Sequence, residues 1–236
     1  MKIVYVNGFL IRNTLDDDFS SIHYHGQEIT RWDKKWYIPK GEVWIDQIYK
    51  DETAWLLKTD HAIERYLRKK PNKSTTSHQK NQKIDTHIDY RHFAKSICRP
   101  GPIPKFIIKS ETNGDIPIQY VNGSIVRQYI DPEFVMGGHD LVYSYITNQE
   151  IWIDILMNPK EIPYILLHEK TERELMAKNG KTYDIAHAFA TVQDMDARVR
   201  DGYGYYPGYA IYPWRGLNNK EIIKKYVISR REKKHR

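Results

Sequence analysis

The hydrophobic positions of this chain change from short strand-like clusters to helical spacing. The stretches YVNGSIVR and EIWID are rich in β-branched and aromatic residues and predict strands. IPYILLHEKTERELMAKNG then has helical apolar spacing, with Pro163 in its first turn and Gly180 as its stop signal. Thr182 resembles the N-cap of a second helix, YDIAHAFATVQDMDARVR, which stops near Gly202. The pattern therefore predicts an α+β unit in which short strands precede a helical hairpin.

This succession of elements occurs twice along the chain. The word YVNG stands at residues 5–8 and again at 120–123, which is unlikely by chance. The other matching segments, in the same order and at similar spacing, are Arg12 and Phe19 with Arg127 and Phe134, YIPKGEVWID with YITNQEIWID, and WLLKTDHAIERYL with YILLHEKTEREL. We predict an internal duplication whose copies pack about a pseudo-twofold axis, because matching apolar faces can bury each other.

Composition divides the chain into four segments. Residues 1–98 form an N-terminal repeat with a polar, Lys-rich loop at 68–87, and residues 99–119 form a proline-containing connector. Residues 120–200 form the C-terminal repeat. Residues 201–236 are a strap rich in Tyr, Gly and Pro that ends in a basic tail, which we expect to be solvated and frayed.

The predicted hairpin of the C-terminal repeat carries a candidate metal site. His168 and Glu172 are four residues apart and share a helix face, and an antiparallel second helix could bring His187 against them. Two imidazoles and one carboxylate leave a fourth position for water, as a catalytic zinc (Zn2+) site requires. His139 is a further ligand candidate or a substrate-facing group, because the glycine pair 137–138 lets the backbone approach closely.

Two more residues of the same helix are candidates for catalysis. Glu169 directly follows the first ligand and is the predicted general base for metal-bound water. Arg173 could orient carboxylates or stabilise developing negative charge. Arg173 also supports an alternative, a buried His/Glu/Arg network without metal, because its charge could neutralise the carboxylates.

The word HEKTE resembles the HExxH motif of the zincin metallopeptidases, with Glu172 in place of the second histidine. The match covers about five residues on one helix. The resemblance implies a metal-dependent hydrolase with zinc as cofactor and a polypeptide as substrate. GGHDLVY, EIWID, LLHEKTERELM and YDIAHAFA together also resemble an uncharacterised family of microbes and their viruses, which implies a possible viral origin but no function.

The N-terminal copy has lost this motif. Alignment of Glu64 with Glu172 places Asp60 opposite His168, so the HE word is absent, and His92 is the candidate remnant of His187. We predict an inactive scaffold copy. The alternative is that Asp60, Glu64 and His92 still bind an ion.

Cysteine content and hydropathy indicate the compartment in which the protein acts. Cys98 is the only cysteine of 236 residues, which excludes an intrachain disulfide and a cysteine-based zinc finger and favours a cytoplasmic or intracellular location. No run of about 18 apolar residues exists, so we expect no membrane partner.

The charge of the chain leaves a second class of function open. A net charge of +7, the basic segments and the many tyrosines would suit a nucleic-acid-binding or virion-associated structural protein. A third reading makes YGYYPGYAIYPW a contact surface for a protein partner, or else a strap packed over the domain.

Overall fold

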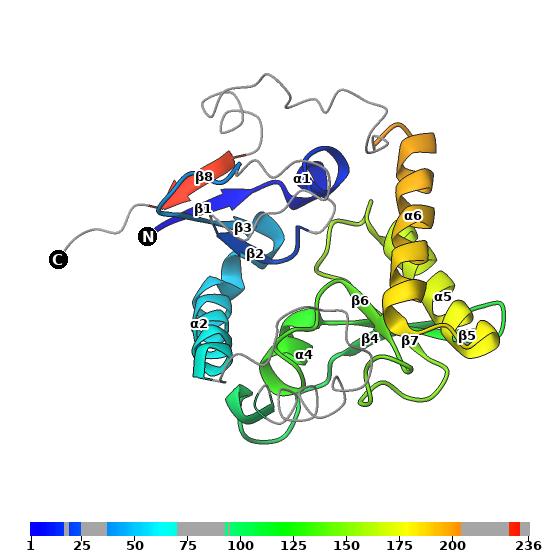
Figure 1. The fold of residues 1–236 in the computed structure, drawn as a ribbon. Helices are drawn as coiled ribbons and strands as arrows, with labels where there is room; N and C mark the ends of the chain where they lie inside the picture. Colours follow the sequence, from blue (N-terminus) through cyan, green and yellow to red (C-terminus); the bar gives the residue numbers. More distant parts are fainter. Residues whose placement is uncertain (17–18, 25–36, 70–92, 94, 204–226, 232–236) are drawn as a thin grey trace.

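The computed structural model describes residues 1–16, 19–24, 37–69, 93, 95–203 and 227–231 (Figure 1). They form an α+β fold around two four-stranded sheets, which confirms the predicted fold class. The first sheet contains β1 (Lys2–Val6), β2 (Ile22–Tyr24), β3 (Glu42–Asp46) and β8 (Val227–Arg231). The second sheet contains β4 (Ile107–Asn113), β5 (Ile116–Val121), β6 (Gly137–His139) and β7 (Ile151–Asp154). The helices are α1 (Gly8–Thr14), the 3-10 helix η1 (Gln47–Glu52), α2 (Thr53–Lys69), α4 (Gly123–Tyr129), α5 (Ile162–Asn179) and α6 (Tyr183–Arg200).

The two sheets have the same arrangement of strands. Their orders are β2-β3-β1-β8 and β6-β7-β5-β4, with a parallel pair in the middle and antiparallel strands on both sides. The registers also agree, because Tyr5 lies opposite Ile45 and Tyr120 lies opposite Ile153. This likeness supports the interpretation of an internal duplication, which stays an interpretation.

The molecule has a first half, built on β1, β2, β3 and β8, and a second half, built on β4 to β7. In both halves the strand that carries YVNG turns at once into a helix. The Asn122 side chain accepts hydrogen bonds from the backbone N–H groups of Ser124 and Ile125, which caps α4. Gly123 donates its N–H to Asp154, and a Cβ atom on this glycine would lie 1.9 Å from that carboxylate. The predicted strand over YVNGSIVR is therefore wrong beyond its first residues, because the Asn cap and the glycine contact outweigh the β-propensity of the residues that follow.

A buried arginine fixes the helix of the first half to both halves. Arg12 of α1 donates to Asp46 at 2.9 Å, to the backbone carbonyl of Phe19 at 3.1 Å and to Glu161 at 2.6 Å. Burial by itself would lower the pKa of Arg12, but the carboxylates of Glu161 and Asp46 raise it. Glu161 directly precedes α5, so this ion pair joins the first half to the second.

Arg127 of α4 makes the reciprocal set of contacts. It donates to Asp154 at 2.8 Å, to the carbonyl of Phe134 at 3.1 Å and to Glu52 at 2.6 and 2.9 Å. Glu52 ends η1, immediately before α2 of the first half. Each half thus supplies the cation that pairs with a buried glutamate of the other half.

Two segments between and after the predicted repeats contain strands that the sequence did not predict. The segment 99–119 is not a simple connector, because it contains β4 and the start of β5, which pair as an antiparallel hairpin. The expectation of a frayed tail is wrong for residues 229–231, which belong to β8 and pair with β1. The loop at 68–87, the aromatic strap and the second helix of the first hairpin fall mostly outside the described residues.

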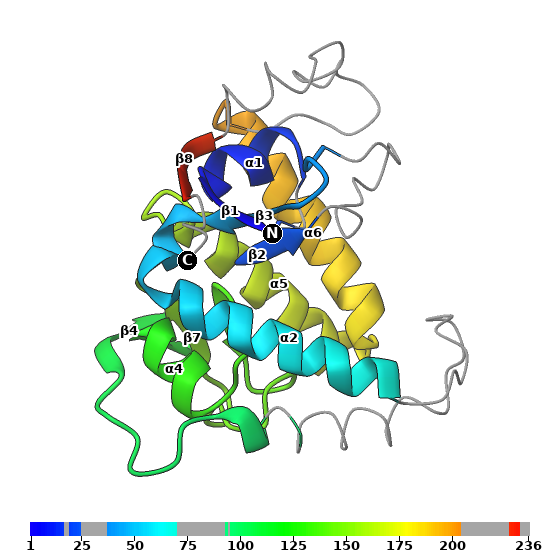
Figure 2. The same cartoon turned by 90° about the vertical axis from the view of Figure 1, so that its left-hand side faces the viewer.

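The predicted helical hairpin of the second half is present. Pro163 lies in the first turn of α5, and Gly180 ends the helix in a left-handed conformation with φ 60°. Thr182 is the N-cap residue of α6. The two helices lie side by side in both views (Figures 1 and 2). None of the described helices is long and apolar enough to cross a membrane.

Candidate metal centre

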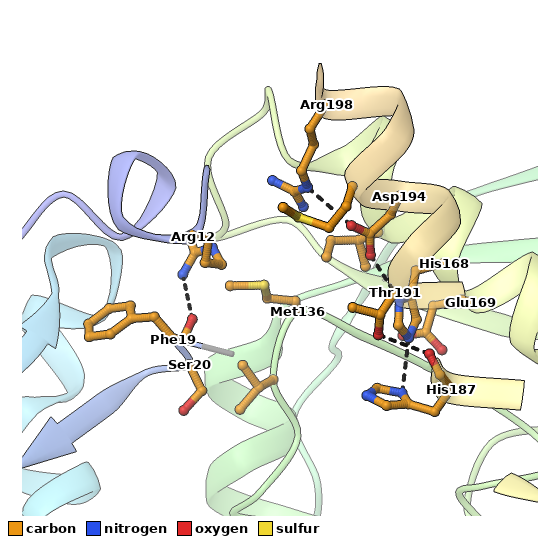
Figure 3. Close-up of a pocket in the computed structure, with 13 residues that line it drawn as sticks. Arg12, Phe19, Ser20, Met136, His168, Glu169, His187, Thr191, Asp194 and Arg198 are labelled. Carbon is orange, nitrogen blue, oxygen red and sulfur yellow. Dashed lines mark hydrogen bonds and ion pairs between the residues drawn. The ribbon is translucent and has the colours of Figure 1, made fainter. Parts of the chain in front are cut away.

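The helical hairpin and strand β6 bring the predicted ligands into one cluster. His168 and Glu172 lie on α5, His187 lies on α6, and His139 ends β6 (Figure 3 labels both helix histidines). Two groups of donor atoms each lie within 4.8 Å of one another: His168, Glu172 and His187, and His139 with Glu169 and Glu172. Glu172 belongs to both groups.

The donor atoms of the first group are close enough together to hold one ion. His168 Nε2 lies 3.1 Å from His187 Nδ1, and Glu172 Oε2 lies 2.7 Å from His187 Nδ1 and 3.5 Å from His168 Nε2. Donors bound to Zn2+ at about 2.0–2.1 Å in a tetrahedron are separated by roughly 3.3 Å. Small side-chain shifts would therefore let all three atoms hold one ion.

Asp194 fixes the orientation of the His168 ring. His168 Nδ1 lies 2.9 Å from Asp194 Oδ2, so an Nδ1 proton is donated to this carboxylate and Nε2 faces the cluster. A carboxylate behind a histidine ligand sets its tautomer and raises its basicity. Sequence analysis assigned no role to Asp194, although it follows His187 by seven residues on the same helix face.

His139 is hydrogen-bonded to the carboxylate of Glu172. The backbone N–H of Leu141 donates to His139 Nδ1 at 3.3 Å, so the proton of the neutral ring lies on Nε2. His139 Nε2 is 2.9 Å from Glu172 Oε1 and donates to it. This hydrogen-bond pattern favours His139 as a positioning residue for Glu172 over a fourth ligand.

The cluster shifts the pKa values of its members in different directions. Burial works against charge on His168, but hydrogen bonds with Asp194 and Glu172 raise its pKa to about 10. Burial would raise the pKa of Glu172, yet His139, His168 and His187 hold it well below its usual range. Burial raises the pKa of Glu169 to about 7, with the charge of His168 opposing and that of Glu172 adding to the shift. Of the two carboxyl groups, Glu172, which contacts His168 and His187, is thus the one that is charged.

Glu169 lies against the glycine strand β6. A Cβ atom on Gly137 would be 2.8 Å from Ile165 and 3.2 Å from the Glu169 carboxyl oxygen. The absence of a side chain at Gly137 therefore gives α5 room to place Glu169 beside the strand. Glu169 also lines the pocket next to the histidines (Figure 3).

Arg173 lies at the edge of the cluster. Its guanidinium donates to Asp140 at 2.6 and 3.3 Å, a bidentate pair that connects α5 to the residue after His139. The structure thus places this predicted catalytic arginine on Asp140, where it fixes the chain that carries His139. It lies one helical turn from Glu169 and next to Glu172 in the sequence.

A pocket of about 230 Å³ opens beside the cluster. His168, Glu169 and His187 line one end, while Phe19 and Ser20 of the first half line the other (Figure 3). Both halves of the chain therefore contribute to the space next to the candidate metal centre.

The contacts of the two halves also align their helices. Glu52 and Glu161 hold equivalent positions before α2 and α5, since each accepts from the buried arginine of the other half. Three residues later, Trp55 and Tyr164 each lie under an arginine guanidinium, at 5.6 and 4.6 Å. These contacts align Glu52 with Glu161, whereas the sequence aligned Glu64 with Glu172. The two alignments of the helices differ by one residue.

The corrected alignment leaves the first half without the two helix ligands. Thr59 lies opposite His168, and Ile63 lies opposite Glu172. Asp60 corresponds to Glu169 and accepts a hydrogen bond from the Tyr24 hydroxyl at 2.5 Å. Among the described residues, both candidate metal groups lie in the second half.

The sequence alternative of an ion bound in the first half is not tested. The side chain of Glu64 and the whole of His92 lie outside the described part of the chain.

Comparisons of the chain with models of known families, with curated proteins and with solved structures found no match.

Proposed function

We propose that the second half of this protein is a metal-dependent hydrolase, with zinc as the metal and an amide or peptide bond as the substrate. The observation that carries the proposal is the triad of donor atoms on His168, Glu172 and His187, all within 3.5 Å of one another. Asp194 and His139 occupy the remaining polar atoms of His168 and Glu172, so the ring and the carboxylate are held ready for one ion.

The surrounding residues would divide the chemistry between them. Zinc would lower the pKa of a bound water and polarise a carbonyl oxygen. Glu169 would accept the proton of the attacking water, because a carboxyl group with a pKa of about 7 exchanges protons readily near neutral pH. Arg173 would act through Asp140 to hold the His139 segment against α5.

Metal content tests the site before any substrate is known. We expect about one zinc per chain in the untagged protein, and none in the His168→Ala, His187→Ala double variant. His61→Ala is the control, because His61 is exposed on α2 and contacts the Leu57 carbonyl of its own helix. Elemental analysis after purification under reducing conditions would give the ratio. No metal in the wild-type protein would overturn the proposal.

The role of Glu169 needs a separate variant. Glu169→Gln keeps the size of the side chain and removes its ability to accept a proton, so metal content should stay unchanged. Hydrolysis of a broad set of peptide substrates should fall by roughly 10²- to 10⁴-fold. Loss of metal and fold together in this variant would make Glu169 structural and the mechanism wrong.

The buried-network alternative is favoured by the hydrogen bonds that already join His168, Glu172 and His187. The pKa of His168 is raised to about 10, so protons could neutralise this cluster without a metal. The metal analysis above distinguishes the two readings directly. The nucleic-acid-binding alternative stays a prediction, because its basic segments fall largely outside the described residues.

A further inference from the structure

The exposed surface of the pocket beside the metal centre is more apolar than polar. Its apolar lining consists of Phe19, Val135, Met136, Ile165 and Met195. Figure 3 shows Met136 between Phe19 of the first half and the histidines of the second. A group bound to the metal would therefore have apolar surface from both halves next to it.

The two arginines of this pocket are already paired. Arg12 donates to Asp46 and Glu161, and Arg198 pairs with Glu161 at 2.8 Å and with Asp194 at 3.3 Å. Their charges are thus neutralised by buried carboxylates. An anionic side chain would have to compete with these pairs, whereas an apolar side chain leaves them intact.

The backbone at Met136 is held in an unfavourable conformation. Its φ of 63° lies in the left-handed region, which a methionine rarely adopts. The N–H of Asp154 donates to the Met136 carbonyl at 2.7 Å and fixes this turn. Met136 is 7% exposed and packs with Ile118 and Met157 of the core, while it also lines the pocket. Strain of this kind gathers at functional sites.

From these observations we infer that the pocket is a specificity site, built by both halves, for an uncharged apolar side chain of the substrate. The inference rests on the proposed function, because it places that side chain next to a metal-bound group. It assigns a binding role to the first half, which supplies Phe19 and Ser20 to the pocket wall.

Three hydroxamic acids, two of which carry side chains of similar size, test the inference on the zinc-loaded protein. The probes are acetohydroxamic acid, an analogue with an isobutyl side chain, and an analogue with a carboxymethyl side chain. Calorimetry should show the isobutyl probe binding roughly tenfold or more tightly than acetohydroxamic acid, because its side chain is buried. The carboxymethyl probe should gain nothing.

Variants of Met136 test whether the pocket causes the difference in affinity between the isobutyl probe and acetohydroxamic acid. Met136→Gly removes the side chain and relaxes the backbone, so the advantage of the isobutyl probe should shrink severalfold while acetohydroxamic acid binds as before. Gln149→Gly is the matched control, since Gln149 is exposed and has a φ of 70°. Met195→Ala on α6 gives a second reading if Met136→Gly fails to fold.

The outcomes separate this inference from the proposed function. Equal binding of the isobutyl and acetohydroxamic probes to zinc-loaded protein would overturn the apolar pocket and leave the metal site standing. An unchanged difference in both pocket variants would do the same. Absence of zinc from the purified protein would overturn the proposed function and this inference together.

Discussion

The two halves of the molecule share a framework and differ in the helix that could carry chemistry. Arg12 and Arg127 make matching contacts, each with an aspartate of its own half and a glutamate of the other. On the helices that follow, the second half has His168 where the first has Thr59. The ion pairs of Arg12 and Arg127 therefore belong to the shared framework. A buried arginine in this fold does not by itself indicate a catalytic site.

The short strands β2 and β6 each contact the helix of their own half, and their last residues differ. Tyr24 ends β2 and His139 ends β6, at equivalent register positions. Tyr24 donates to Asp60 of α2, and His139 donates to Glu172 of α5. A strand-to-helix hydrogen bond thus exists in both halves, and only the residue types make one of them suitable for holding a metal ligand.

Removal of either buried arginine should have the largest effect on stability. Arg127→Met leaves the buried Glu52 and Asp154 without their cation, and Arg12→Met does the same to Asp46 while Glu161 keeps its pair with Arg198. In each variant the free energy of unfolding should fall by about 3–5 kcal/mol, with the larger loss for Arg127→Met. Arg65→Met, an exposed residue of α2, should cost less than about 0.5 kcal/mol. Urea denaturation monitored by circular dichroism would give the three values. A loss below about 1 kcal/mol for either buried arginine would contradict the shared framework.

Asp194→Asn and Asp60→Asn test whether only the second half binds zinc. The amide cannot support the tautomer of His168 as the carboxylate does, so zinc affinity should fall by about 10- to 100-fold. Asp60→Asn in the first half should leave the affinity unchanged. Competition with a chromophoric chelator measures both, and thermal melting checks that Asp194→Asn is folded. Equal affinity of Asp194→Asn and the wild-type protein would show that Asp194 has no part in the site.

The caps of the two short helices should give the smallest and most symmetrical effect. Asn7 and Asn122 each accept backbone hydrogen bonds at the start of α1 and α4. Asn7→Ala and Asn122→Ala should each lower the free energy of unfolding by about 1 kcal/mol and leave zinc content unchanged. A cost confined to one of them would mean that the two junctions are not energetically equivalent.

Local signals in the sequence predicted the helical hairpin and the shared helix face of His168 and Glu172. Pro163 and Gly180 limit α5 by mechanisms that act within a few residues, and the spacing of His168 and Glu172 follows from the helical period. Both could therefore be read without a structure. His187 needed the added assumption of an antiparallel hairpin.

Contacts between distant segments could not be predicted in this way. The ion pair of Arg12 with Glu161 joins residues 149 positions apart, and no local pattern encodes it. The pairing of β8 with β1 depends equally on tertiary structure. The sequence also could not show that His139 donates to Glu172. That direction follows from the backbone N–H of Leu141, which donates to His139 Nδ1 and leaves the ring proton on Nε2.

The pairing of β8 with β1 gives the first sheet the strand order of the second through a different chain connection, as a circular permutation would. In the second sheet, β4 and β5 are consecutive and form a hairpin, whereas in the first sheet the strand in the place of β4 is β8. Arg231 lies opposite Ile3, so a short turn between them would give the first half the hairpin that the second already has (Figure 1). A permuted chain joined there and opened elsewhere would have the same order of elements in both halves.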